Sequence, residues 1–263
     1  MHTVVDERPL IRCDQHGVAT LTLNRPGQFN ALSEEVLKAL NGELSRLTHD
    51  STVRCVVIAA EGRAFCAGHD LKQMRATRDK AYYQQLFSLC GDVMQRIVEL
   101  PLPVIARVQG IATAAGCQLV ASCDMAVATR SARFAVSGIN VGLFCSTPAV
   151  ALSRTIGRKR AMEMLFTGEF IDAEQALEWG LINRVADDEA LDDTLAELTT
   201  SICAKSAVAL RTGKALFQRQ LQMPLREAYV LAGETMACNM MAEDASEGID
   251  AFIEKREPRW QNR

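Results

Sequence analysis

Two buried, strand-like runs each lead into a segment of small residues that opens a helix, and this arrangement constrains the fold most. The first pair is Val53-Arg-Cys-Val-Val-Ile58 followed by Ala64-Phe-Cys-Ala-Gly-His-Asp-Leu-Lys72, and the second is Val104-Ile-Ala-Arg-Val108 followed by Gly110-Ile-Ala-Thr-Ala-Ala-Gly-Cys-Gln118. A helix N-terminus leaves backbone N–H groups without acceptors, and such groups bind oxygens that carry negative charge. If the N–H groups of His69 and Ala115 converge, they form an oxyanion hole for an enolate or a tetrahedral anion.

Strand-like and helix-like patterns alternate along the chain up to about residue 195. Residues 18–23 read as a strand that ends in a turn, and the next helix is capped by Ser33. Residues 82–100 read as a helix that two prolines stop, and residues 125–128 read as a further strand. Repeated units of this kind predict an α/β fold with a parallel, right-handed sheet, in which ligands bind at the carboxyl ends of strands.

Past residue 200 the pattern changes to helices alone. We expect helices over residues 202–222, 225–241 and 245–256, with methionines on their apolar faces. A chain of 263 residues does not need three extra helices to close its core. We therefore expect a core over residues 1–200 and a C-terminal helical region over residues 201–263 that packs against another subunit.

The composition excludes several classes of protein. With 29 basic and 32 acidic residues, the chain has no positive field for a nucleic acid, so nucleic-acid binding is disfavoured. Nine cysteines occur singly, with no spacing typical of a metal site, which indicates reduced thiols and no metal. No apolar run is long enough to span a membrane, and residues 1–8 show no targeting pattern. These observations predict a cytoplasmic protein.

Several motifs, in this order and spacing, resemble the crotonase superfamily, which comprises the enoyl-CoA hydratases and isomerases. They are Leu23-Asn-Arg-Pro26 with Asn30-Ala-Leu32, Arg63-Ala-Phe-Cys-Ala-Gly68 with Asp70-Leu-Lys72, Pro103-Val-Ile-Ala106, Cys123-Asp124, the run 157–168, Ala173-Glu-Gln-Ala176 and Ala251-Phe-Ile-Glu-Lys-Arg256. The resemblance covers nearly the whole chain. Residues 140–148 are most similar to the subgroup called enoyl-CoA hydratase domain-containing proteins.

This resemblance implies a spiral of β-β-α repeats, a C-terminal helical trimerisation region, and a trimer or hexamer. It implies an acyl-CoA thioester as substrate or ligand and no separate cofactor. Carried over by position, the oxyanion donors are the N–H groups of His69 and Ala115. The resemblance also implies contacts to the coenzyme A portion from Ala67, His69, Asp70, Leu71, Lys72, Phe252 and Lys255.

The two glutamates that hydrate an enoyl thioester in this family are replaced here. Their positions carry Gln118 and Gly138. A glutamine amide orients water but does not exchange protons near neutral pH, and glycine has no side chain. Because general acid–base help is worth about 10²- to 10⁴-fold, we expect hydration to be slow or absent.

Other groups near these segments leave alternatives open. The His69 imidazole is able to shuttle protons, although its backbone N–H already accounts for the position. Cys66 and Cys117 flank the two small-residue segments but have no evident activating base, and Cys145 is a candidate for lining the acyl end. The sequence therefore supports an acyl-CoA enzyme of the lyase or isomerase class, with a non-catalytic acyl-CoA-binding or assembly protein as the alternative.

Overall fold

The structure is a computed structural model that describes residues 7–263. Most of the segment on which the prediction of no targeting pattern rests, residues 1–6, lies outside the described residues. No helix within residues 7–263 combines the length and apolarity that crossing a membrane requires.

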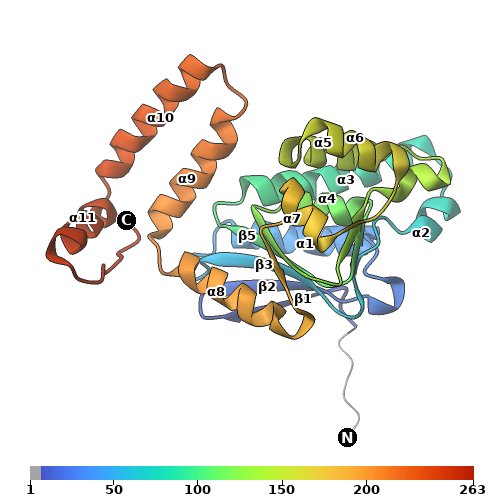
Figure 1. Ribbon diagram of the computed structural model, residues 1–263, viewed down its shortest axis with the longest axis horizontal. Helices are drawn as coiled ribbons and strands as arrows, with labels where there is room; N and C mark the ends of the chain where they lie inside the picture. Colours follow the sequence, from blue (N-terminus) through green and yellow to red (C-terminus); the bar gives the residue numbers. More distant parts are fainter. Residues whose placement is uncertain (1–6) are drawn as a thin grey trace, which may run out of the picture.

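Two sheets form the centre of the molecule (Figure 1). Among the described residues, the larger sheet has the strand order β1 (Leu10–Gln15), β2 (Val18–Leu23), β3 (Cys55–Ala60), β5 (Val104–Val108), β7 (Met125–Thr129) and β10 (Arg184–Ala186). The smaller sheet, in the same part of the chain, has the order β4 (Ala64–Cys66), β6 (Ile111–Thr113), β8 (Arg133–Ala135) and β9 (Ile171–Asp172).

From β3 to β8, consecutive strands enter different sheets, which produces a β-β-α spiral. The pairs β3 and β4, β5 and β6, and β7 and β8 each place their first strand in the larger sheet and their second in the smaller one. Strands β2 to β10 of the larger sheet are parallel, and so are β4, β6 and β8. The predicted parallel α/β architecture is therefore confirmed.

Helices cover both sheets, and the apolar faces of α1 and α3 supply much of the core. The helices that follow the strands of the spiral are α1 (Glu34–Leu47), α2 (Leu71–Ala76), α3 (Lys80–Glu99), α4 (Ala115–Ser122), α5 (Ser146–Thr155), α6 (Arg158–Thr167), α7 (Ala173–Trp179) and α8 (Leu191–Cys203), with the 3₁₀ turns η1 (Pro26–Gln28), η2 (Ser137–Val141) and η3 (Asp188–Ala190). Helix α1 begins as predicted, because the Ser33 side chain accepts a hydrogen bond from the Val36 N–H. Every residue of β3 is buried, which explains its uninterrupted apolar sequence.

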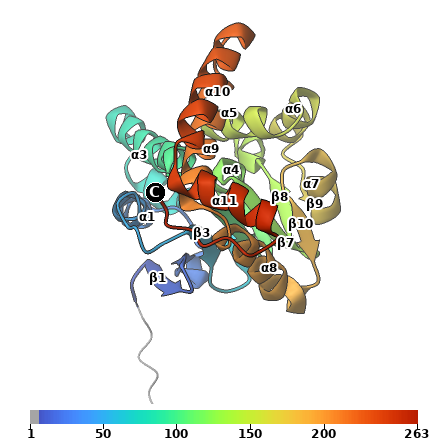
Figure 2. The ribbon, with the colours of Figure 1, turned by 90° about the vertical axis from the view of Figure 1, so that its left-hand side faces the viewer.

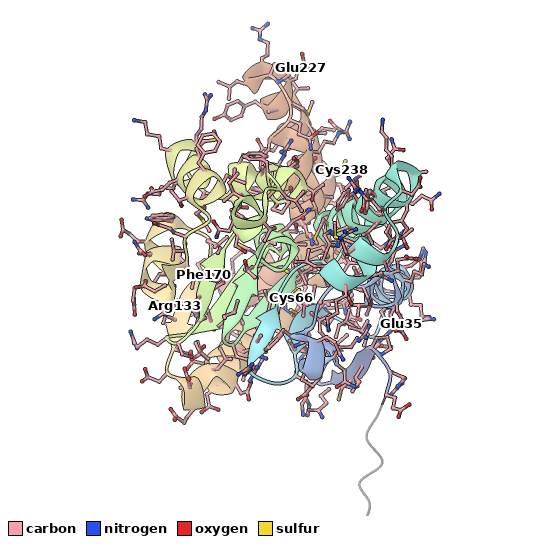
Figure 3. The ribbon with its side chains drawn as sticks, turned by 90° about the vertical axis from the view of Figure 1, so that its right-hand side faces the viewer. Glu35, Cys66, Arg133, Phe170, Glu227 and Cys238 are labelled. Atoms are coloured by element: carbon pink, nitrogen blue, oxygen red, sulfur yellow. The ribbon has the colours of Figure 1, made fainter. Side chains whose placement is uncertain are left out.

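Three C-terminal helices project from this body. They are α9 (Ala207–Gln220), α10 (Leu225–Met240) and α11 (Glu243–Glu254). Figures 1 and 2 both show α10 reaching beyond the rest of the chain, with Glu227 near its far end in Figure 3. The helix expected over residues 202–222 is divided in the structure, because α8 ends at Cys203 and Ser206 caps α9 by accepting from the Ala209 N–H.

Candidate active site

Three neighbouring parallel strands bring the predicted site residues to one edge of the smaller sheet. Strand β6 pairs with β4 on one side and with β8 on the other. The carboxyl end of β4 leads into His69, that of β6 into Ala115, and that of β8 into Gly138. Figure 3 labels Cys66, the last residue of β4, at the centre of the molecule. Since ligands bind outside the carboxyl ends of parallel strands, this edge is the candidate site.

Gly68 places the first small-residue segment directly against the second. Its φ of +90° lies in the region that favours glycine. A Cβ at this position would lie 2.8 Å from the Ala114 Cβ and 3.2 Å from the Ala115 nitrogen. The backbone before His69 therefore touches the backbone before α4, and only glycine allows this approach without displacement.

The Ala115 amide is the first of α4, so it has no acceptor within its helix. Ala114, with φ 51° and ψ −120°, precedes the helix in an unusual conformation that its own N–H stabilises by donating to the Ala135 carbonyl at 3.0 Å. Neither the Ala115 N–H nor the His69 N–H donates a hydrogen bond to another described residue. Two unused backbone donors therefore lie on adjoining segments.

Residues 29–32 hold the first segment in place, a role that their sequence alone did not predict. The Ala67 N–H donates to the Phe29 carbonyl at 3.0 Å, and the Leu32 N–H donates to the Gly68 carbonyl at 2.7 Å. The Asn30 side chain is buried and donates to the carbonyls of Glu61 and Ala64. The motif Asn30-Ala-Leu32 was the sequence signal for this role, because a buried asparagine side chain needs hydrogen-bond partners from the surrounding backbone.

The His69 imidazole is packed as a neutral ring. Its Nδ1 lies 3.4 Å from the Leu32 carbonyl oxygen, and its edge meets the Phe87 ring at 5.4 Å between centroids. Its Nε2 is buried and has no hydrogen-bond partner among the described residues. Burial lowers the pKa of His69 below its ordinary value of 6.5, because charging the ring would cost solvation.

We expect this buried histidine to make stability sensitive to acid. The unfolded chain binds a proton near pH 6.5, whereas the folded chain stays neutral to a lower pH. The free energy of unfolding is therefore undiminished above that value and falls as the pH drops below it, by at most about 1.4 kcal/mol per pH unit. Urea unfolding at about pH 7.5 and about pH 5.5 measures this effect. His69→Gln should reduce the difference, whereas replacing the exposed His49 by Gln should not, and equal responses would contradict the assignment.

Gln118 lies one helical turn after Ala115, on the same face of α4. Its side chain is 4% exposed, and its Oε1 has no donor among the described residues. Gln118 also lines a cavity of about 1190 Å³ between α3, α4, α5 and α9. The amide therefore has an unused acceptor beside open space, but no proton to exchange near neutral pH.

Cys145 occupies the space beside Gly138. The Gly138 N–H donates to the Cys145 Sγ at 3.3 Å. A Cβ at residue 138 would lie 2.7 Å from that sulfur and 2.7 Å from the Leu143 carbonyl oxygen. The turn from residue 138 to residue 145 therefore brings Cys145 and the Leu143 carbonyl against Gly138, and it leaves no room for a longer side chain there.

The buried cysteines near the site are thiols. Burial raises the pKa of Cys66 and of Cys117 to about 12 and also raises that of Cys145. Since the thiolate is the reactive form, none of the three is activated as a nucleophile. Within residues 7–263, no three His, Cys, Asp or Glu side chains gather as a metal site would require.

The residues expected to contact coenzyme A divide into two groups. Ala67, His69, Asp70, Leu71 and Lys72 follow β4, where Asp70 caps α2 by accepting from the N–H groups of Lys72 and Gln73 at 3.0 and 3.1 Å. Phe252 and Lys255 lie on and just after α11, and Phe252 is 85% exposed. Figure 1 shows α11 and α2 on opposite sides of the molecule, so one copy does not bring the two groups together.

Comparison with known proteins identifies the family to which this chain belongs. The sequence model of the family Enoyl-CoA hydratase/isomerase matches residues 14–263. The chain belongs to the enoyl-CoA hydratase/isomerase family. The crystal structure of enoyl-CoA hydratase from Mycobacterium smegmatis is similar, with a TM-score of 0.95 and 60% identity over 97% of this chain and 99% of that one. The human enoyl-CoA hydratase domain-containing protein 3 has a TM-score of 0.94 and 43% identity over 96% of this chain and 100% of that one. The crotonase fold is thus confirmed.

A relative from this family corrects one prediction. Enoyl-CoA hydratase domain-containing protein 3 of Rattus norvegicus, named as mitochondrial, is 45% identical over 94% of this chain and 82% of its own length. The prediction of a cytoplasmic protein is therefore wrong, because relatives of this name are mitochondrial. Composition and reduced cysteines do not identify a compartment by themselves.

Proposed function

We propose that this member of the family binds an acyl-CoA thioester and stabilises the anion formed at its carbonyl with the His69 and Ala115 amides. The observation that carries this proposal is the close approach of the Gly68 backbone to the start of α4, where a Cβ at Gly68 would lie 3.2 Å from the Ala115 nitrogen. This approach places two unused donors on adjoining segments. Donors of this kind stabilise charge that develops on a carbonyl oxygen, and one donor is worth about 3 to 4 kcal/mol.

The side chains around this anion favour chemistry other than hydration. Gln118 supplies an amide, and Gly138 faces the neutral Cys145 thiol, so neither position offers a carboxylate. Isomerisation, decarboxylation and thioester hydrolysis each need the anion to be stabilised. None of them depends on two glutamates that hold one water.

A second candidate is binding without turnover. It is favoured by the same absence of a base, since Gln118 exchanges no proton and the His69 ring is neutral and enclosed. On this hypothesis the chain presents or stores an acyl-CoA on an enzyme scaffold.

We also propose a homo-oligomer, a trimer or hexamer, in which the second group of coenzyme A contacts comes from another copy. The projecting C-terminal region exposes large apolar side chains. They are Leu225, Tyr229, Val230, Met241 and Phe252. Such a surface is typical of a protein interface. An adjacent copy would bring its Phe252 and Lys255 toward the segment that begins at His69.

Calorimetric titration with butyryl-CoA and free coenzyme A tests the proposal. We expect the thioester to bind more tightly, because only its carbonyl meets the two amides. Turnover is then measured with enoyl-, 3-hydroxyacyl- and malonyl-type thioesters. We expect crotonyl-CoA to be hydrated slowly or not at all. Turnover of another ester supports the enzyme, binding without turnover supports the second candidate, and no affinity for any thioester contradicts both.

A further inference from the structure

One wall of the cavity beside Gln118 is formed by the C-terminal helix α9 and not by the core. Helices α3, α4 and α5 supply residues such as Val98, Ala121 and Val150. Helix α9 supplies Leu210 and Phe217, and Leu221 follows directly after it. Helix α9 has no fully buried residue. Its distance from the core, and hence the width of the cavity, depends on few contacts.

Lys214 makes the charged contact that fixes this wall. Its ammonium group donates to the carbonyl oxygens of Ile97 and Leu102 at 2.9 and 3.0 Å, and to Asp124 Oδ2 at 2.6 Å. These three acceptors match its three N–H donors. Ile97 belongs to the last turn of α3, where a positive charge is favourable. The Lys214 side chain is 9% exposed, so the contact is largely shielded from water.

Asp124 holds the other side of this contact. It lies just before β7, and its Oδ2 also accepts from the Val104 N–H at 2.7 Å. The pair therefore connects α9 to two neighbouring strands of the larger sheet, β5 and β7. Breaking it would release α9 from the part of the core that borders the cavity.

We infer that Lys214, paired with Asp124, is a positioning residue that sets α9 as the far wall of an acyl-chain cavity and thereby selects thioesters with long acyl chains. The inference rests on the proposed function, because an acyl chain whose carbonyl is bound near Ala115 must extend past Gln118 to enter this cavity. The cavity of about 1190 Å³ exceeds what a four-carbon acyl group fills. Its apolar wall residues favour methylene groups, and each buried methylene strengthens binding by about fourfold.

The test compares butyryl-CoA and dodecanoyl-CoA by calorimetry in four proteins. They are the wild type, Lys214→Arg, the double variant Lys214→Met with Asp124→Asn, and Lys205→Met as the matched control. The double variant removes both charges, so no unpaired charge stays buried. Lys205 is an exposed lysine just before α9. Circular dichroism checks that each variant is folded.

We expect the double variant to bind dodecanoyl-CoA about tenfold more weakly than the wild type and butyryl-CoA within about twofold, because only the long chain reaches α9. Lys214→Arg keeps the charge and should show a smaller loss, which carries the test if the double variant does not fold. Lys205→Met should match the wild type. Equal losses for both esters in the double variant, or no loss for either, would overturn the inference. The proposed function would still stand in that case if the wild type binds butyryl-CoA. Failure of the wild type to bind any thioester would overturn both.

Discussion

Gly68→Ala should lower the rate of any thioester reaction of this protein by about 10²- to 10³-fold. The added methyl group would lie 2.8 Å from the Ala114 Cβ and 3.2 Å from the Ala115 nitrogen, so the two segments must separate. Separation removes one donor from the anion. It should also abolish the preference for butyryl-CoA over its thioether analogue, which has no carbonyl. Steady-state kinetics and calorimetry measure the two effects.

The control for this substitution is Gly42→Ala. Gly42 lies within α1, and a Cβ there meets no atom within 4 Å, so alanine should be neutral or slightly stabilising. Thermal unfolding of both variants separates damage to the site from loss of the fold. A folded Gly68→Ala protein with unchanged rate and unchanged preference would show that the two amides do not act together.

Gln118→Glu should raise crotonyl-CoA hydration by about 10²-fold or more, because it restores one carboxylate to the face of α4 that carries Ala115. The new carboxyl group would replace an amide whose Oε1 has no partner, so the exchange sacrifices no hydrogen bond of that oxygen. Absorbance of the enoyl thioester follows the reaction. Gln118→Met, similar in size and unable to transfer a proton, is the control and should show no gain.

Adding Gly138→Glu to this variant should not raise the rate further. The Cβ at residue 138 would collide with the Cys145 sulfur and with the Leu143 carbonyl oxygen. Replacing Cys145 by Gly removes the first contact but not the second. A further gain in rate from the second glutamate, equal to or larger than the first, would show that the turn over residues 138–145 moves readily. If Gln118→Glu alone gives no gain in a folded protein, the water site is absent.

Several elements were predictable from the sequence because their signals extend over enough residues. The helical spacing after Ser33 and the buried run at residues 53–58 each correspond to an element of the structure, with ends shifted by up to two residues. The strand at residues 125–128 is β7. The parallel arrangement followed from repeated strands and helices, because such connections are right-handed and place strands side by side.

The smaller sheet was not predictable in the same way. Strands β4, β6 and β8 have three residues each, too few to show a period of two. The helix α2 is also short, with six residues. The two small-residue segments were therefore predictable, whereas the sheet that brings them to one edge was not.

The amino-acid sequence by itself determined which groups are available: small residues before two helices, an amide at Gln118 and no side chain at Gly138. Only the tertiary structure decided which of them meet. The close approach of the Gly68 and Ala115 segments and the contact of Lys214 with Asp124 both join residues far apart in the chain. Such contacts arise from the crossing of the chain between two sheets and from the docking of α9. Local periodicity and residue type describe neither, because both are properties of neighbours along the sequence.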